Sequence, residues 1–312
     1  MIRRKRILSL LLKISYHCLG KNKLYSDKSD LSCSPFFIVG TGRNGSTLLS
    51  MILNGHSKIF IPNEQYALHY AAIRYQLYNF LIWRDIVKIV IGEFADSCNT
   101  QNWKTDFNNL YKRLYDLPKN KRSFQKIIDE IVLEHSKQKE NPFTIWGDKS
   151  VPTIWFLDYV YRIYPKSKYI FLIRDGRDVV SSFHRAGKET FGDLSKIENA
   201  AKNWKNAVKR WNWLKKRAAK HQLLEIRYET LVTEPEIVIK EVVEFLGLEF
   251  EEGMLNFKNV VVERNLFDQI HSGLSKPINK DHMGAWEEYL TQVQLDEILP
   301  IIKKELRQYN YL

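Results

Sequence analysis

The chain has 312 residues, of which 44% are hydrophobic and 27% are charged. This composition is that of a folded globular protein and excludes a disordered or fibrous chain. Lys and Arg number 48 against 36 Asp and Glu, so the formal net charge is +12. A basic surface favours anionic partners such as nucleotides, polyanions or anionic lipid. We expect no nucleic acid among them, because the sequence has no RNA-binding or zinc-finger signature.

The N-terminal segment, residues 1–34, is basic at its start and then carries a short apolar stretch at residues 7–12. That stretch is far shorter than the about 20 apolar residues that span a bilayer. We interpret it as a surface helix, with peripheral contact to anionic lipid at the inner membrane surface as the alternative. The three cysteines are far apart and form no CxxC pair, which favours reduced thiols in the cytoplasm. They are Cys18, Cys33 and Cys98.

From residue 35 onward, apolar runs typical of buried strands alternate with helical patterns. The predicted strands are residues 35–40, 169–173 and 223–227. The predicted helices are residues 46–54, 152–164, 198–220 and 235–246, with another from Val179. The alternation predicts an α/β fold of the P-loop-like, three-layer kind, with a central parallel sheet flanked by helices. We expect residues 35–312 to form one domain with a helical insertion at about residues 66–140.

Residues 40–47 form a glycine-rich loop between the first predicted strand and helix, and read Gly-Thr-Gly-Arg-Asn-Gly-Ser-Thr. Backbone N–H groups and a helix N-terminus at such a place form a cradle for anions. The Walker A pattern is matched at three positions, Gly40, Gly45 and Thr47, but its lysine position holds Ser46. A nucleoside triphosphate hydrolase needs that lysine on the terminal phosphates. Arg43 offers a cation from a different place in the loop, and a plain glycine turn is the alternative interpretation.

A second motif, residues 173–182, reads Ile-Arg-Asp-Gly-Arg-Asp-Val-Val-Ser-Ser. Together the two motifs resemble the sulfotransferase superfamily, which binds 3′-phosphoadenosine-5′-phosphosulfate. The resemblance implies that Arg174 and Ser182, eight residues later, hold the 3′-phosphate, with the arginine as a bidentate fork. It also implies that the loop holds the 5′-phosphosulfate, through Arg43, Asn44, Gly45, Ser46 and Thr47. A solvated charged turn is the alternative for this second motif.

Two shorter matches point to the tyrosylprotein-sulfotransferase-like and bacterial branch of the superfamily. Tyr228, in Arg-Tyr-Glu-Thr-Leu at residues 227–231, is similar to the family's tyrosine on the adenine side. Lys276, in Lys-Pro-Ile-Asn at residues 276–279, is similar to a lysine that meets the nucleotide. A buried tyrosine at a strand end and a solvated loop lysine are the alternatives.

The same resemblance supplies the candidates for chemistry. It implies that Glu64 is the general base for the acceptor hydroxyl and that Lys149 steadies the leaving group at the bridging oxygen. A helix-capping role is the alternative for Glu64, and pairing with Asp148 is the alternative for Lys149. His56 is the rival base. No group of side chains has convincing metal-ligand spacing, so we expect no bound metal.

The leading hypothesis is therefore an enzyme that transfers a sulfuryl group from 3′-phosphoadenosine-5′-phosphosulfate to an acceptor hydroxyl by in-line displacement. The acceptor is a glycan, a peptide tyrosine or a small molecule, and we expect it to bind at the helical insertion. One alternative is an atypical P-loop kinase or NTPase in which Asp175 would stand at the strand end as a magnesium ligand. Another is a nucleotide-binding protein without catalysis.

Overall fold

The computed structural model describes residues 24–26, 31–78, 80–97, 100, 103, 105–137, 142–256 and 278–312. The chain forms two compact units, which we describe separately. The helical unit comprises Met1–Pro35, Pro62–Trp146 and Asp158–Ser167. The sheet unit comprises Phe36–Ile61, Gly147–Leu157 and Lys168–Leu312. The prediction for the apolar stretch at residues 7–12 lies outside the described residues, and the division of the chain at residue 35 stays a prediction.

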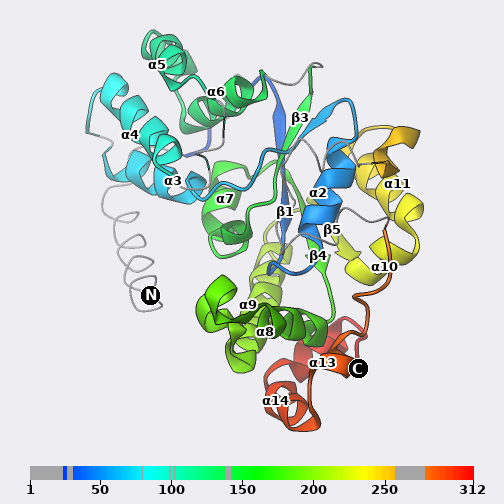
Figure 1. Ribbon diagram of the computed structural model, residues 1–312. Helices are drawn as coiled ribbons and strands as arrows, with labels where there is room; N and C mark the ends of the chain where they lie inside the picture. The colour runs from blue at the N-terminus through cyan, green and yellow to red at the C-terminus, as the bar shows by residue number, and fades with distance from the viewer. Residues whose placement is uncertain are drawn as a thin grey trace. The chain divides into compact units, whose positions relative to one another are not determined.

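A five-stranded sheet of order β2-β3-β1-β4-β5 organises the fold (Figure 1). Its strands are β1 (Ser34–Val39), β2 (Ile59–Phe60), β3 (Ile145–Asp148), β4 (Lys168–Ile173) and β5 (Leu223–Arg227). β4 pairs in parallel with both β1 and β5, and its residues after Lys168 are all buried. Parallel strands end at the same edge of a sheet, so the segments that follow β1, β4 and β5 emerge together. The predicted α/β fold with a parallel sheet flanked by helices is confirmed.

Helices cover the strands of the sheet unit. They are α2 (Ser46–Asn54), α8 (Gly176–Phe191), α9 (Ile197–Lys215), α10 (Tyr228–Thr233), α11 (Pro235–Leu246), α13 (Trp286–Tyr289) and α14 (Gln292–Gln308). α9 buries two tryptophans completely, and the ring of Trp211 stacks on Phe171 of β4 at 5.1 Å. Trp204 donates from its indole N–H to the carbonyl of Arg174 at 3.0 Å. A Cβ on Gly176 would lie 2.8 Å from the Trp204 ring, so this close packing requires glycine.

The helical unit contains α3 (Leu68–Leu77), α4 (Trp83–Ala95), α5 (Phe107–Tyr115), α6 (Phe124–Ser136) and α7 (Leu157–Ile163). Four of them fall in the predicted insertion. α6 carries a buried ion-pair network in which Lys126 lies 3.1 Å from Asp129 and 2.9 Å from Glu130. Asp129 also accepts a bond from the backbone N–H of Ser32 at 2.9 Å, which ties the start of the chain to this helix. Within the described residues, no helix is both long and apolar enough to cross a membrane.

Several predicted boundaries differ from the structure. The helix predicted at residues 152–164 is divided into a 3-10 turn, η2 (Val151–Ile154), and α7. The helix predicted from Val179 begins three residues earlier, because Asp175 caps it by accepting from the N–H of Arg177 at 2.8 Å. The helix predicted at residues 198–220 ends at Lys215. Strands β2 and β3 and helix α14 were not predicted; β2 has two residues, and β3 contains Gly and Asp, which are depleted in strands.

Candidate functional site

The glycine-rich loop runs from the end of β1 into α2 with an unusual backbone. Gly42, Arg43 and Gly45 all have positive φ, at 78°, 57° and 92°. Left-handed turns of this kind orient successive N–H groups toward a common concavity that suits an anion. Gly45 is the N-cap of α2 and has no side chain to satisfy the first N–H groups of the helix. The loop therefore has the backbone geometry expected of an anion cradle.

Asn44 fixes the loop to the sheet. Its side chain is 1% exposed and donates from Nδ2 to the carbonyl of Leu172 in β4 at 2.8 Å. Its Oδ1 accepts from the N–H of Ser46 at 3.3 Å. A Cβ at Gly40 would lie 1.9 Å from that Nδ2, so glycine is needed for this contact. The Asn44 side chain thus holds the loop against β4. From the sequence we predicted only that Asn44 contacts the nucleotide.

Tyr228, at the end of β5, lies against the same loop. Its ring would contact a Cβ at Gly45 at 2.5 Å, and the guanidinium of Arg174 lies 4.6 Å from the ring centroid. Burial raises the pKa of the Tyr228 hydroxyl, while the Arg174 charge opposes the shift. The structure therefore brings the three predicted residues Gly45, Arg174 and Tyr228 together. An approach of Tyr228 to adenine stays a prediction.

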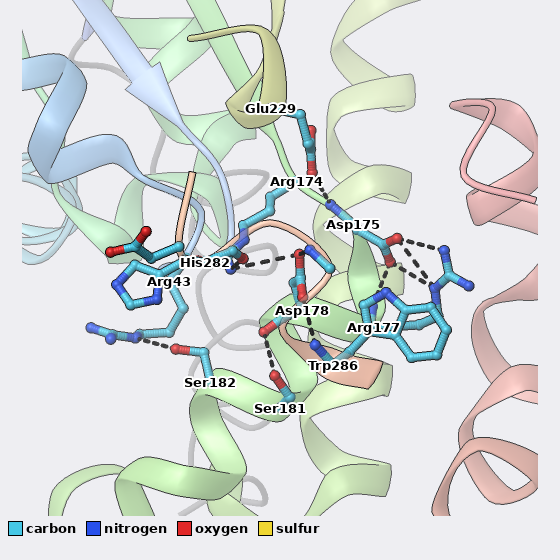
Figure 2. Close-up of polar contacts among 12 residues, drawn as sticks. Arg43, Arg174, Asp175, Arg177, Asp178, Ser181, Ser182, Glu229, His282 and Trp286 are labelled. Carbon is cyan, nitrogen blue, oxygen red and sulfur yellow. Dashed lines mark hydrogen bonds and ion pairs between the residues drawn. The ribbon is translucent and has the colours of Figure 1, made fainter. Parts of the chain in front are cut away.

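Two more contacts join the two predicted phosphate motifs. Arg43 donates from Nε to Oγ of Ser182 at 3.0 Å, and Arg174 donates to the carbonyl of Arg43 at 3.0 Å (Figure 2). Arg174 is 7% exposed, and its Nε has no hydrogen-bond partner among the described residues. Two guanidinium groups and a hydroxyl thus converge where the loop meets the start of α8. This arrangement suits a phosphate, which accepts several charge-assisted bonds.

Asp178, which the sequence did not single out, closes this cluster from α8. It is 1% exposed and accepts from the N–H groups of Gly284 at 3.0 Å and Trp286 at 2.9 Å. It also lies 3.7 Å from Arg174, which in turn donates to the carbonyl of His282 (Figure 2). Burial raises the pKa of Asp178, and the Arg174 charge opposes the shift. The segment at residues 278–286 is therefore fastened across Arg174 by its backbone, a contact that side-chain patterns in a sequence do not reveal.

The charge of the cluster acts on the His282 side chain as well. Partial burial and the positive charges of Arg174, Arg185 and Arg43 lower the pKa of His282, while Asp281 opposes them. Three arginines from the loop, the end of β4 and α8 thus act on one imidazole. The local potential is positive, as an anion site requires.

Asp175 has structural partners. Arg177 forms a bidentate pair with it, with a shortest distance of 2.6 Å. Its backbone N–H donates to Glu229 at 3.0 Å, and Glu229 accepts from the hydroxyl of Tyr311 at 2.8 Å. The Asp175 carboxylate is thus paired with an arginine at the start of α8. This pairing does not support the alternative in which Asp175 is the magnesium ligand of a kinase. Among the described residues, no three His, Cys, Asp or Glu side chains are grouped to hold a metal ion.

Lys149 follows β3 and reaches the start of α2. It is buried, and its Nζ donates to Oγ1 of Thr47 at 3.1 Å. Asp148 accepts from the hydroxyls of Ser150 at 2.6 Å and Thr153 at 2.5 Å. The lysine therefore brings an ammonium group to the loop from a different strand. Its contact, Thr47, is next to position 46, which a lysine occupies in the Walker A pattern.

The remaining predicted residues are placed as follows. Glu64 belongs to the helical unit, where the hydroxyl of Tyr66 donates to it at 3.2 Å. Lys276 lies outside the described residues. His56 is buried; its Nδ1 accepts from the N–H of Lys58 at 3.0 Å and its Nε2 lies 2.9 Å from the carbonyl of Glu249. Both ring nitrogens of His56 are thus engaged, which leaves neither free to accept a proton from an acceptor.

Comparison with known proteins then decides the family. The model of the sulfotransferase family matches residues 35–252, more than half of the chain. The chain belongs to the sulfotransferase family. A protein-tyrosine sulfotransferase A from Caenorhabditis elegans is 22% identical over 292 residues, which cover 89% of this chain and 69% of the relative. The chain is accordingly a sulfotransferase enzyme, and its predicted family is confirmed.

Solved structures show the same fold. The sulfotransferase domain from the curacin biosynthetic pathway has a TM-score of 0.59 and 20% identity, covering 87% of this sulfotransferase and 97% of that chain. A mouse sulfotransferase complexed with PAP has a TM-score of 0.51 and 10% identity, covering 94% and 89% of the two chains.

The close contact between Gly45 and Tyr228 gives a stability prediction. In Gly45→Ala, the new Cβ meets a buried ring and the residue must keep a φ of 92°. We expect a loss of about 1–3 kcal/mol in the free energy of unfolding. Gly92→Ala is the matched control, since a Cβ there meets nothing within 4 Å in the interior of α4. The control should gain about 0.5–1 kcal/mol. Thermal denaturation of both variants measures this, and equal melting temperatures would contradict the packing argument.

Proposed function

We propose that this sulfotransferase uses 3′-phosphoadenosine-5′-phosphosulfate as its donor and transfers the sulfuryl group to an acceptor hydroxyl by in-line displacement. The observation that carries the proposal is the cluster of Arg43, Arg174 and Ser182 at the start of α8, beside an anion cradle. Two phosphate sites at neighbouring strand ends suit a nucleotide that is phosphorylated at both its 5′ and 3′ positions. The mouse sulfotransferase complexed with PAP, adenosine 3′,5′-bisphosphate, supports the choice of donor.

Each predicted donor-binding residue has a role in this proposal. The loop, with Ser46 and Thr47 at the start of α2, holds the 5′-phosphosulfate through backbone N–H groups and hydroxyls. Arg174 and Ser182 hold the 3′-phosphate. Tyr228 lines the adenine side, and Lys276 meets the nucleotide from the C-terminal segment.

The kinase alternative is less well supported. Its lysine position holds Ser46, and Asp175 is paired with Arg177 instead of being open to a metal ion. A non-catalytic nucleotide-binding protein is also less well supported, because Lys149 is directed at Thr47. A protein that only bound a nucleotide would have no need of a buried ammonium beside the transferring group.

The proposed step balances as follows. The acceptor oxygen bonds to sulfur while the bond from sulfur to the bridging oxygen breaks, and that electron pair passes to the departing phosphate. Lys149 stabilises the charge that develops on this oxygen. Glu64 takes the proton of the acceptor hydroxyl. The chain's own residues thus supply the positioning, the charge stabilisation and the base, with no metal.

For the acceptor, we propose a tyrosine hydroxyl of a protein or peptide, because the relative from Caenorhabditis elegans carries the name protein-tyrosine sulfotransferase. The surface charge of this chain favours an acidic peptide over a neutral one. A screen with labelled donor and acceptors of each class tests this choice. Sulfation of a glycan or small-molecule hydroxyl in place of tyrosine would contradict it. The cytoplasmic location stays a prediction that cell fractionation tests.

The donor assignment predicts selective stabilisation by the bisphosphate. Adenosine 3′,5′-bisphosphate should raise the melting temperature by at least about 3 °C more than ADP, because the 3′-phosphate adds charge at Arg174 and Ser182. Ser182→Ala, a small change at this cluster, should remove part of the difference, and Arg174→Gln should remove most of it. Differential scanning fluorimetry without magnesium measures the wild type and both variants with each of the two ligands. Equal stabilisation by the two ligands would refute the donor assignment.

The role of Lys149 predicts a loss of turnover with little loss of affinity. Charge on the bridging oxygen develops only as the bond to sulfur breaks, so an interaction with it raises kcat. Lys149→Met should lower turnover by at least about a hundredfold while bisphosphate binding weakens by less than about fivefold. Lys202→Met, at an exposed site on α9, is the matched control and should leave both values unchanged. Equal losses of rate and affinity in Lys149→Met would place the lysine in ground-state binding.

The assignment of Glu64 as the base predicts that substitutions at Glu64 and at His56 have different effects on turnover and melting temperature. Glu64→Gln keeps the size of the side chain but cannot take up a proton, so turnover should fall by at least about a hundredfold at a normal melting temperature. His56→Gln should lower the melting temperature, since the ring bridges Lys58 and Glu249, but should change turnover little. Steady-state kinetics with a fixed acceptor measures both. An active Glu64→Gln beside an inactive, folded His56→Gln would move the base to the histidine.

A further inference from the structure

The turn between α3 and α4 exposes an apolar run. Tyr78 is 40% exposed, Phe80 is 74% exposed and Ile82 is 67% exposed. In the helical unit, the large hydrophobic side chains that the described residues expose lie only on α3, at Tyr70, and in this turn. Exposed apolar side chains that gather at one place mark an interaction site more often than scattered ones do.

Packing within the helical unit does not require these side chains. The buried face of α4 begins after the turn, at Ile86 and Val87. Trp83 anchors the start of α4 by donating from its indole N–H to the carbonyl of Leu114 at 2.7 Å. Phe80 and Ile82 therefore lie outside the core that holds the helical hairpin together. Burial of each against an apolar partner would therefore favour association.

Basic side chains lie at the first turn of α4, directly after the exposed residues, and on the segment that contacts it. Arg122 lies with its guanidinium 5.5 Å from the Trp83 ring, and Arg84 pairs with Asp116 at 3.1 Å. The exposed 3-10 turn η1 (Lys119–Lys121) lies directly before Arg122 and contributes Lys119. We name Arg84, Lys119 and Arg122 the basic collar. Asp116 pairs with one of their three charges, so the collar is net positive.

We propose that the exposed side chains of Tyr78, Phe80 and Ile82 dock the protein on an anionic lipid bilayer. Phe80 and Ile82 enter the boundary between headgroups and acyl chains, and the basic collar lies against the lipid phosphates. Aromatic and aliphatic side chains beside cations are the composition of interfacial membrane elements. The rings of Tyr78 and Phe80 lie edge to face at 6.2 Å between α3 and α4. A fluid bilayer accepts exposed side chains of this kind without a complementary groove, whereas a folded partner would have to supply one.

This inference goes beyond the proposed function and does not rest on it. It is also independent of the basic N-terminal segment, since all of its residues lie between Tyr78 and Arg122. One weak signal rarely gives stable anchoring, so the turn would be a second signal beside that segment. A sulfotransferase held in this way would act on acceptors at or near a membrane surface.

Vesicle flotation of the full chain tests the proposal. The vesicles consist of phosphatidylcholine alone or of phosphatidylcholine mixed with phosphatidylglycerol. The full chain should float with the anionic vesicles and bind the neutral ones at least about tenfold more weakly. The double variant Phe80→Ser with Ile82→Ser should lose at least about tenfold in binding to the anionic vesicles. Ile237→Ser is the matched control, because Ile237 is 64% exposed on α11 of the sheet unit, and it should float normally.

A charge variant separates the collar from the turn. Arg122→Gln with Lys119→Gln should weaken binding to the anionic vesicles and leave binding to the neutral ones unchanged. Circular dichroism melts of all variants should coincide with the wild type, since the substituted side chains are not buried. Normal flotation of the folded serine variant would overturn the proposal. So would a wild-type chain that ignores vesicles while the serine variant loses sulfation of a polypeptide acceptor, because the turn would then dock a protein.

Discussion

A buried guanidinium at the end of β4 holds the site together. Arg174 contacts Asp178 of α8, four residues further along, and three segments that are distant in sequence: the backbone of the loop at Arg43, the ring of Tyr228, and the carbonyl of His282. Removing a cation from water costs several kcal/mol unless charges and carbonyls compensate for it. Each of the four segments supplies part of that compensation. The loop, α8 and the C-terminal segment therefore adopt their positions together, and a change in one alters the others.

The same constraint explains why the surroundings of Arg174 are so closely packed. Its own carbonyl accepts from the indole of Trp204, and the next residue but one, Gly176, lets that ring approach the chain. Asp175 is held by Glu229 and Arg177, which fixes the first turn of α8. A phosphate site needs its donors held before the ligand arrives, because ordering them afterwards would reduce affinity. The close packing around β4 thus holds the phosphate-binding residues at the carboxyl end of this strand in place.

The sequence predicted the strands β1, β4 and β5 and the helix α2 closely, because each carries an apolar pattern typical of its kind of element. It also predicted that Arg174 and Ser182 act together and that both phosphate motifs lie at strand ends, where parallel sheets bind ligands. It missed Asp178 and the backbone of the segment beyond residue 278. Those contacts join residues about a hundred positions apart through backbone N–H groups, which every residue except proline carries, so no side-chain pattern marks them. The role of Asn44 beneath the loop was missed for the same reason: its acceptor is the carbonyl of Leu172.

The cations of the site are distributed in a way that suits the proposed chemistry. A terminal phosphate carries about −1.5 to −2 charges, and a Walker lysine compensates for them on the transferring group. A sulfuryl group carries a single negative charge, so a cation on the group itself is less necessary, and position 46 can be a serine. The charge that must be stabilised appears instead on the phosphate that leaves. Lys149 approaches Thr47 from β3, and Arg43 and Arg174 lie toward α8. In the proposed step, the Lys149 ammonium would stabilise the leaving oxygen, and the two guanidinium groups would select the nucleotide.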